Sequence, residues 1–84
     1  MIEEEKLVVY GTRWCGDCRR ALKMLNERNL TFIWVDIDRD PKAEAYVIVT
    51  NHGNRSVPTI VFPDGSIMVE PSNNDLSLKL DSMA

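Results

Sequence analysis

Hydrophobic residues gather along the chain in short runs, and each run has the character of a strand. The run "KLVVY" (residues 6–10) is rich in β-branched residues and is followed by Gly11, which we expect to stop it. The run "TFIWVDID" (31–38) predicts a second buried strand. Two further runs, "TIVF" (59–62) and "SIMVE" (66–70), flank the turn sequence "PDG", so we expect a hairpin there.

Between the first two runs the apolar spacing becomes helical. A helix beginning at Cys15 and ending within residues 26–29 would place on one face the positions i, i+3, i+4 and i+7, which are Cys18, Ala21, Leu22 and Leu25. Charged side chains fill the intervening positions. The pattern therefore predicts an amphipathic helix with the second cysteine on its buried face.

Two more helices are indicated by their start signals. Asp40 followed by Pro41 is typical of a helix start, and we expect Gly53 to stop this helix. Its expected apolar stripe comprises Ala43, Tyr46, Val47 and Thr50. The sequence "SNND" (72–75) is similar to a capping box and opens a short helix carrying Leu76, Leu78 and Leu80.

The predicted order is β-α-β-α-β-β-α within a single domain of residues 1–84. A crossover helix joins the first two strands, so these should be parallel, and the final hairpin makes the four-stranded sheet mixed. We therefore expect an α/β fold with one mixed sheet.

Composition and charge narrow the classes of function. The chain has 84 residues, 44% of them hydrophobic, and a net charge of −3, which gives no reason to expect nucleic acid as a partner. No apolar run approaches the roughly 20 residues that cross a bilayer, so we expect no membrane association. The acidic start "MIEEEK" differs from a signal peptide, and we expect a cytoplasmic location.

Both cysteines of the chain, Cys15 and Cys18, lie two residues apart. They could form a structural disulfide, half a metal site or a redox pair. A disulfide at this spacing closes a small loop and constrains little of the unfolded chain. A metal site commonly needs about four ligands, and His52 is the only histidine, so a second chain or external thiols would have to complete it. The redox pair is therefore favoured, and no metal is expected.

The two cysteines differ in their predicted surroundings. Cys15 lies at the helix start, where free N–H groups and the helix dipole stabilise a thiolate, and Arg13 adds positive charge. Asp17 opposes this effect, because a nearby carboxylate raises the pKa of a thiol. Cys18 lies on the apolar face and should be buried and protonated. We expect Cys15 to attack and Cys18 to resolve, with Gly16 letting a substrate sulfur approach the backbone.

The sequence "SVPT" (56–59) places Pro58 just before a core strand. Proline at such a position can simply open the strand. We expect instead a cis Val57–Pro58 bond that faces the cysteines and leaves the N–H and C=O of Val57 to pair with an extended substrate.

Taken together, these signals resemble the glutaredoxin family of the thioredoxin superfamily, in particular its mycoredoxin-like branch. The matching motifs are "WCGDC" (14–18), "NRSVPT" (54–59) and "PS" (71–72). The resemblance implies a thioredoxin-like fold. It also implies a thiol–disulfide oxidoreductase that reduces mixed disulfides between proteins and a low-molecular-weight thiol, and protein disulfides as well.

The residues and the resemblance together lead us to expect the following site residues and partners. Cys15 and Cys18 would be catalytic, and the substrate-binding residues would be Arg13, Trp14, Gly16, Val57, Pro58, Ser72 and Asn73. We expect no tightly bound cofactor, a small thiol (mycothiol-like or glutathione) as co-substrate, oxidised or thiolated proteins as targets, a flavoenzyme reductase system and a monomer.

The chain departs from glutathione-using members near its last helix. Glu70 and Pro71 stand where those members have two glycines, and Asn73 and Asn74 replace an acidic pair. These departures favour a mycothiol-like thiol over glutathione.

Two alternative functions stay open. One is a module that binds a metal or an iron–sulfur cluster. The other is a redoxin electron donor reduced by a thioredoxin-reductase-type enzyme, although "MVEPS" (68–72) replaces the W-S-G-F-like run of that group. Trp34 is expected in the core and His52 in solvent, while Trp14 and Arg55 are open between packing or solvated roles and substrate binding.

Overall fold

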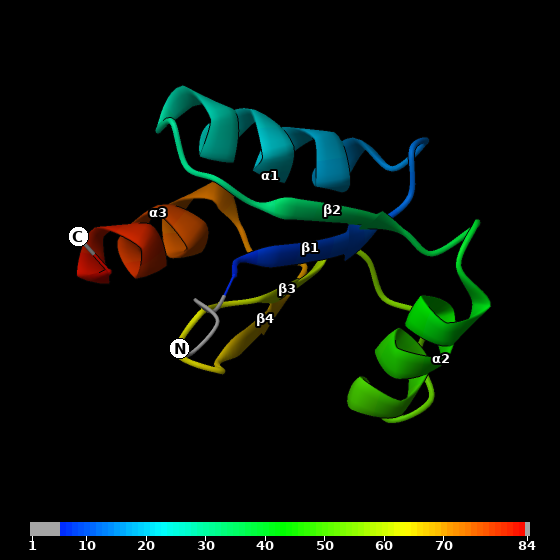
Figure 1. Cartoon of the computed structure of the whole chain (residues 1–84). Helices are drawn as coiled ribbons and strands as arrows, with labels where there is room; N and C mark the ends of the chain where they lie inside the picture. The colour runs from blue at the N-terminus through cyan, green and yellow to red at the C-terminus, as the bar shows by residue number, and fades with distance from the viewer. Residues whose placement is uncertain (1–5, 84) are drawn as a thin grey trace, which may run out of the picture.

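A computed structural model describes residues 6–83, in which four strands form one sheet and three helices pack against it (Figure 1). Residues 1–5 and 84 of the predicted domain lie outside the described residues. The elements along the chain are β1 (Val8–Gly11), α1 (Gly16–Glu27), β2 (Ile33–Asp36), α2 (Pro41–Thr50), β3 (Thr59–Val61), β4 (Ile67–Val69) and α3 (Asn73–Ser82). The predicted order and fold class are confirmed, with strands shorter than the apolar runs.

The strands lie in the order β2-β1-β3-β4. β1 and β2 are parallel, as the crossover predicts, while β3 is antiparallel to both β1 and β4. We expected β1 to stop before Gly11, but Gly11 is its last residue and pairs with Asp36. The parallel strands therefore end together at one edge of the sheet, where the loop that leads to Cys15 begins.

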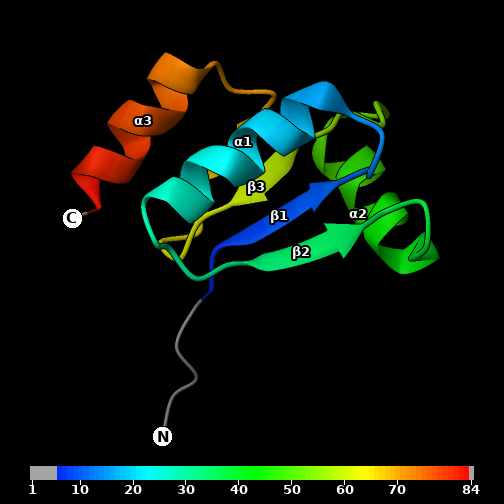
Figure 2. The same ribbon diagram turned by 90° about the horizontal axis from the view of Figure 1, so that it is seen from above.

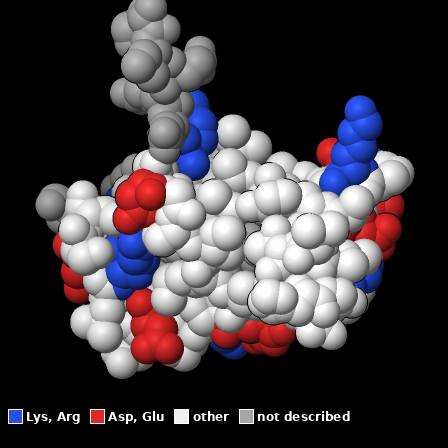
Figure 3. All heavy atoms as spheres, turned by 90° about the horizontal axis from the view of Figure 1, so that it is seen from below, with Lys and Arg blue, Asp and Glu red and all other residues white. Residues whose placement is uncertain are grey.

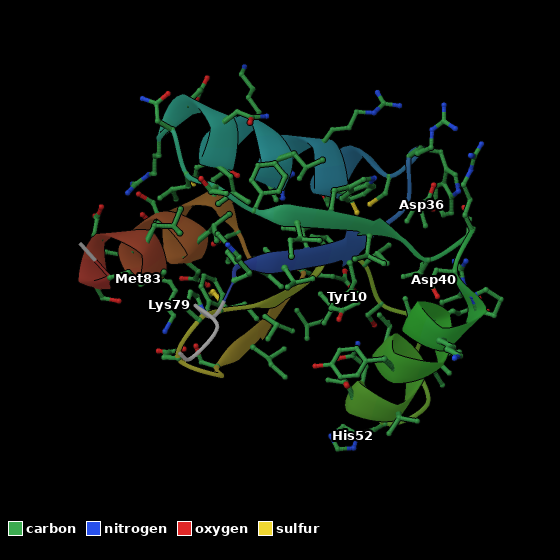
Figure 4. All side chains as sticks on the ribbon, in the orientation of Figure 1. Tyr10, Asp36, Asp40, His52, Lys79 and Met83 are labelled. Atoms are coloured by element: carbon green, nitrogen blue, oxygen red, sulfur yellow. The ribbon has the colours of Figure 1, made fainter. Side chains whose placement is uncertain are left out.

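Helices cover both faces of the sheet (Figure 2). α1 and α3 share one core with the sheet, built from Leu7, Val9, Ala21, Leu25, Ile60, Phe62, Leu76 and Leu80. α2 packs on the opposite face, where Ile37, Ala43 and Val47 meet Tyr10, Val35 and Val57. The Tyr10 ring lies 5.0 Å from that of Tyr46 and is seen beneath the sheet beside α2 (Figure 4).

Each helix begins at a side chain that accepts a backbone N–H three residues later. The capping residues are Cys15, Asp40 and Ser72, as the sequence predicts. Gly53 follows α2 with φ = 100° and donates its N–H to Ile48, so the predicted stop is confirmed. These local hydrogen bonds fix where each helix begins and where α2 ends.

A buried polar chain anchors the segment before β3. The Asn51 side-chain amide donates to Thr59 Oγ1 at 3.0 Å, and the Thr59 hydroxyl donates to the Ser56 carbonyl at 2.8 Å. Because buried polar groups are costly when unpaired, these bonds hold the end of α2 against the start of β3. They thereby position the segment that contains Val57 and Pro58.

Two apolar side chains of the predicted helices are exposed. Leu78 is 60% exposed and Tyr46 is 38% exposed. Leu76 and Leu80 lie one turn apart on the buried face of α3, so Leu78 between them must point outward.

Seen from the side opposite α1, the middle of the surface carries few charged side chains (Figure 3).

Among residues 6–83, the helices are too short and too polar for any of them to traverse a bilayer.

The two leucines of α3 provide a matched test of this packing. Leu76→Ala should lower the free energy of unfolding by about 2 to 5 kcal/mol, because it leaves a cavity in the core. Leu78→Ala should change it by about 0.5 kcal/mol or less, since that side chain is mostly exposed. Urea denaturation followed by circular dichroism measures both, and similar losses in the two variants would contradict the placement of α3.

Candidate active site

Cys15 lies at the end of the loop that connects β1 to α1. Its backbone is extended (φ = −83°, ψ = 119°), and its sulfur accepts the backbone N–H of Cys18 at 3.3 Å. The residue is half-buried, and the thiol is not in a disulfide. A thiolate at this position would keep the same hydrogen bond and face the positive end of the helix dipole.

Cys18 lies one turn further and is fully buried. Burial raises the pKa of its thiol to about 12, and this effect outweighs a hydrogen bond from the Thr12 backbone that lowers it. The nearby Cys15 and Asp17 raise it further. The predicted difference in burial between the two cysteines is therefore present.

The Val57–Pro58 peptide bond is cis, as predicted, and lies opposite the first cysteine. The Cys15 Sγ is 3.9 Å from the carbonyl oxygen of Val57 and donates to it. Pro58 is buried and Val57 is half-buried, and both lie just before β3. Segments about 40 residues apart in the sequence thus meet at the sulfur of Cys15.

Trp14 stands beside Cys15 and is 65% exposed, so it does not fill the core. Its indole N–H donates to the Asp38 carboxylate at 2.9 Å. Asp38 also pairs with Arg55, whose guanidinium bonds Glu44 as well. These hydrogen bonds, first from Arg55 and then from Trp14, hold the pKa of Asp38 below its ordinary value. Arg55 is therefore held by two ion pairs and is not simply solvated.

The network of Asp38, Arg55 and Glu44 was not predicted from the sequence. A usable signal was present, because parallel neighbouring strands end at the same edge of a sheet. Asp38 follows β2 as Trp14 follows β1, so their side chains come together. The partner arginine could not have been identified, since it comes from the loop after α2.

A groove of about 390 Å³ lies next to Trp14 and is lined by Arg13, Trp14, Arg19, Asp36, Asp38 and Arg39. Arg13 is exposed, and its carbonyl accepts a hydrogen bond from Arg19. Asp36 is seen on this side of the sheet (Figure 4). The structure therefore brings two predicted binding residues, Arg13 and Trp14, to one hollow beside Cys15.

A second set of predicted residues lies between α1 and α3. Arg20 of α1 pairs with Asp17 of the same helix at 2.9 Å and donates to Asn73 Oδ1 of α3 at 3.0 Å. The second hydrogen bond links the two helices. The Ser72 hydroxyl accepts the Asp75 N–H at 3.0 Å and caps α3. Gly16 opens onto free space, with nothing within 4 Å of where a Cβ would stand.

His52 lies in the turn after α2, far from the start of α1 (Figure 4). It is exposed, as expected. Within residues 6–83, no three side chains of His, Cys, Asp and Glu are arranged so that they could hold a metal ion.

Comparison with known proteins identifies the family. The Glutaredoxin family model matches residues 7–67. A Mycobacterium tuberculosis protein (strain H37Rv) named as a glutaredoxin is 38% identical over 78 residues, covering 93% of each chain. Mycoredoxin 1 of Corynebacterium glutamicum is 35% identical over 78 residues, covering 93% of this chain and 96% of the relative.

Solved structures agree on the fold. A mutant form of the thioredoxin-like protein BC3987 superposes with a TM-score of 0.77 at 24% identity, over 89% of this chain and 99% of the other. A glutaredoxin from Archaeoglobus fulgidus superposes with a TM-score of 0.72 at 21% identity, over 90% and 86% of the two chains. The thioredoxin-like fold predicted from the sequence is therefore confirmed.

Members of the matched family exchange thiols and disulfides, with a low-molecular-weight thiol as co-substrate and thiolated proteins as targets. In this chain the paired cysteines lie at a helix start, opposite the cis Val57–Pro58 bond and beside a thioredoxin-like sheet. The chain belongs to the glutaredoxin family of thiol–disulfide oxidoreductases.

Proposed function

We propose that this protein reduces mixed disulfides between proteins and a low-molecular-weight thiol, and protein disulfides as well, through the dithiol Cys15–Cys18. The observation that carries the proposal is the difference between the two thiols. Cys15 is accessible at a helix start and faces the Val57 carbonyl, whereas Cys18 is fully buried.

The reaction follows from this geometry. The Cys15 thiolate attacks the small-thiol sulfur of the mixed disulfide, the target protein leaves as a thiolate that takes up a proton, and the small thiol stays on Cys15. A second small thiol then attacks the bound small-thiol sulfur and frees the Cys15 thiolate. Alternatively, Cys18 attacks the Cys15 sulfur, so that a Cys15–Cys18 disulfide forms and the small thiol leaves as a thiolate. The backbone N–H of Cys18, 3.3 Å from the Cys15 sulfur, stabilises the negative charge whenever Cys15 is a thiolate.

The substrate would lie along the segment before β3. The N–H and C=O of Val57 pair with an extended substrate backbone, Pro58 holds that edge opposite Cys15, and Trp14 forms the facing wall. Gly16 leaves space open above Cys15, and Arg13 supplies positive charge to the groove beside Trp14.

The preferred small thiol is proposed to be mycothiol-like rather than glutathione. Glu70 has φ = 49°, a conformation that favours glycine, and its side chain narrows the approach where glutathione users have two glycines. Pro71 cannot donate an N–H. The Asn73 oxygen accepts from Arg20, so its amide N–H₂ remains to donate to hydroxyl groups. The relative named Mycoredoxin 1 points in the same direction.

The partners follow from the same chemistry. The small thiol must be kept reduced, which calls for a flavoenzyme reductase system and a reducing compartment, and we propose the cytoplasm. One chain supplies both cysteines and the edge at Val57, so a monomer suffices for the reaction.

A coupled assay tests the proposal. Mixed disulfides of a protein and of a small molecule are offered with mycothiol and, separately, with glutathione. We expect efficient turnover with mycothiol and little with glutathione, because the surroundings of Glu70 and Pro71 do not suit the glutathione backbone. Turnover with glutathione that equals or exceeds turnover with mycothiol would defeat the proposed thiol specificity.

Cysteine variants are the controls in the same assay. Cys15→Ser should abolish turnover of every substrate. Cys18→Ser should retain turnover of small mixed disulfides and lose turnover of protein disulfides, which need two sulfurs. Equal loss in both variants on the small substrate would contradict the assigned roles.

The hydrogen bond between Trp14 and Asp38 gives a pH-dependent prediction. Because the folded pKa of Asp38 is depressed, the bond should be intact at neutral pH and lost only as the pH falls through that lowered value. The Trp14 indole N–H signal in ¹⁵N–¹H NMR spectra should therefore titrate below the ordinary range of a carboxyl group. Asp38→Ala should abolish this titration and raise the KM for mixed disulfides about fivefold, with kcat little changed.

Asp64→Ala is the matched control, because the pKa of Asp64 is also depressed but its partners are Ser66 and Lys79. This variant should leave the Trp14 titration and the KM unchanged. A Trp14 signal that does not titrate in the wild type would mean that the indole is not held by Asp38.

A further inference from the structure

Gly11, the last residue of β1, lies where two side chains from other elements converge. A Cβ placed on Gly11 would stand 2.6 Å from the Cys18 sulfur and 2.9 Å from two ring carbons of Trp34. Both distances are shorter than van der Waals contact, so the sulfur and the indole fill the space of the missing side chain. They are therefore neighbours, because both lie within 2.9 Å of the same point.

Trp34 reaches this point from the middle of β2. It pairs with Val9 of β1 and packs, half-buried, against the core shared with α1 and α3. The two ring carbons near Gly11 are Cη2 and Cζ3, which form the outer edge of the six-membered ring. Cys18, with no exposed surface, thus lies between α1, the backbone of β1 and this ring edge.

We propose that Trp34 is a positioning residue for the resolving cysteine: its ring edge, packed over Gly11, encloses the Cys18 thiol and slows its attack on a mixed disulfide at Cys15. The side-chain-free strand end at Gly11 is the second part of this enclosure.

The chemistry at stake is the fate of the mixed disulfide between Cys15 and a small thiol. In one route a second small thiolate attacks the bound small-thiol sulfur, forming the disulfide of the small thiol and freeing the Cys15 thiolate. In the other route Cys18 loses its proton to solvent and attacks the Cys15 sulfur. A Cys15–Cys18 disulfide forms, and the small thiol leaves as a thiolate that takes up a proton.

Enclosure of Cys18 acts on the second route alone. The Cys18 thiol must ionise before it attacks, and burial is the main cause that raises its pKa to about 12. An apolar ring against the sulfur excludes the water that would stabilise the thiolate. Trp34 would thereby favour release by a second small thiol over closure of the internal disulfide.

Alkylation of Cys18 tests this directly. In a Cys15→Ser background, the rate of reaction with iodoacetamide is followed by intact mass between about pH 7 and 10, where the rate reports the thiolate fraction. Trp34→Val is compared with Phe32→Val, a matched control in which an aromatic residue that packs on the same core is removed. Thermal unfolding of each variant is measured alongside, so that the alkylation rates are compared between variants of similar stability.

Trp34→Val should raise the alkylation rate about tenfold at each pH, the effect of lowering the Cys18 pKa by about one unit. The alkylation rate of Phe32→Val should stay within about twofold of the parent rate, which is clearly distinguishable from the tenfold change that one pKa unit gives. Equal rates in the two variants would overturn the proposal. If Trp34→Val does not fold, Trp34→Phe, which removes the outer ring edge, decides by the same comparison with Phe32→Val.

The second readout uses proteins that retain both cysteines. Each is loaded with a small thiol on Cys15, and conversion to the internal disulfide is followed by intact mass without added thiol. Conversion should be about tenfold faster in Trp34→Val than in Phe32→Val, in step with the thiolate fraction. Unchanged conversion would overturn the proposal. The inference rests on the proposed exchange at Cys15, but alkylation of Cys18 needs no substrate, so the two can fail separately.

Discussion

The hydrogen bond from the Cys18 backbone N–H to the Cys15 sulfur is the interaction on which the site depends. It starts α1 at a sulfur rather than at the usual hydroxyl or carboxylate oxygen, and so places one thiol at the open end of the helix. The helical repeat then carries the other thiol one turn inward, onto the face that packs against the sheet. One local geometry thus creates two different thiols.

The sheet brings the rest of the site to that helix start. β1 and β2 are parallel and end together, so the loops after them place Trp14 beside Asp38. β3 runs antiparallel to β1, so β3 begins at the same edge, and Val57 in the segment just before it faces Cys15. The arrangement explains how residues far apart in the sequence surround a single sulfur atom.

Features set by local sequence could be predicted, whereas features set by packing between elements could not. The caps at Cys15, Asp40 and Ser72 depend on residues within one turn, and the pattern revealed all three. The outward turn of Leu78 follows only once α3 is packed through Leu76 and Leu80, because all three leucines look alike in the sequence.

The same distinction holds within the site. The cysteine pair and the segment at Pro58 carry motifs, so their meeting was predicted. The burial of Cys18 was predicted too, but not that Gly11 and Trp34 surround its sulfur, because Gly11 looked like a strand stop and Trp34 like ordinary core. Their roles appear only when β2 lies beside β1 and beneath α1. The ion pairs of Arg55 likewise depend on how α2 packs, which no local pattern shows.

The central claim is that the two thiols differ, with Cys15 the one that meets the substrate. The most direct measurement is to quench the wild-type protein shortly after it is mixed with a small-molecule disulfide, and to map the modified cysteine by peptide mass spectrometry. We expect the small thiol to be found on Cys15, because Cys18 is fully buried. An adduct found mainly on Cys18 would contradict it.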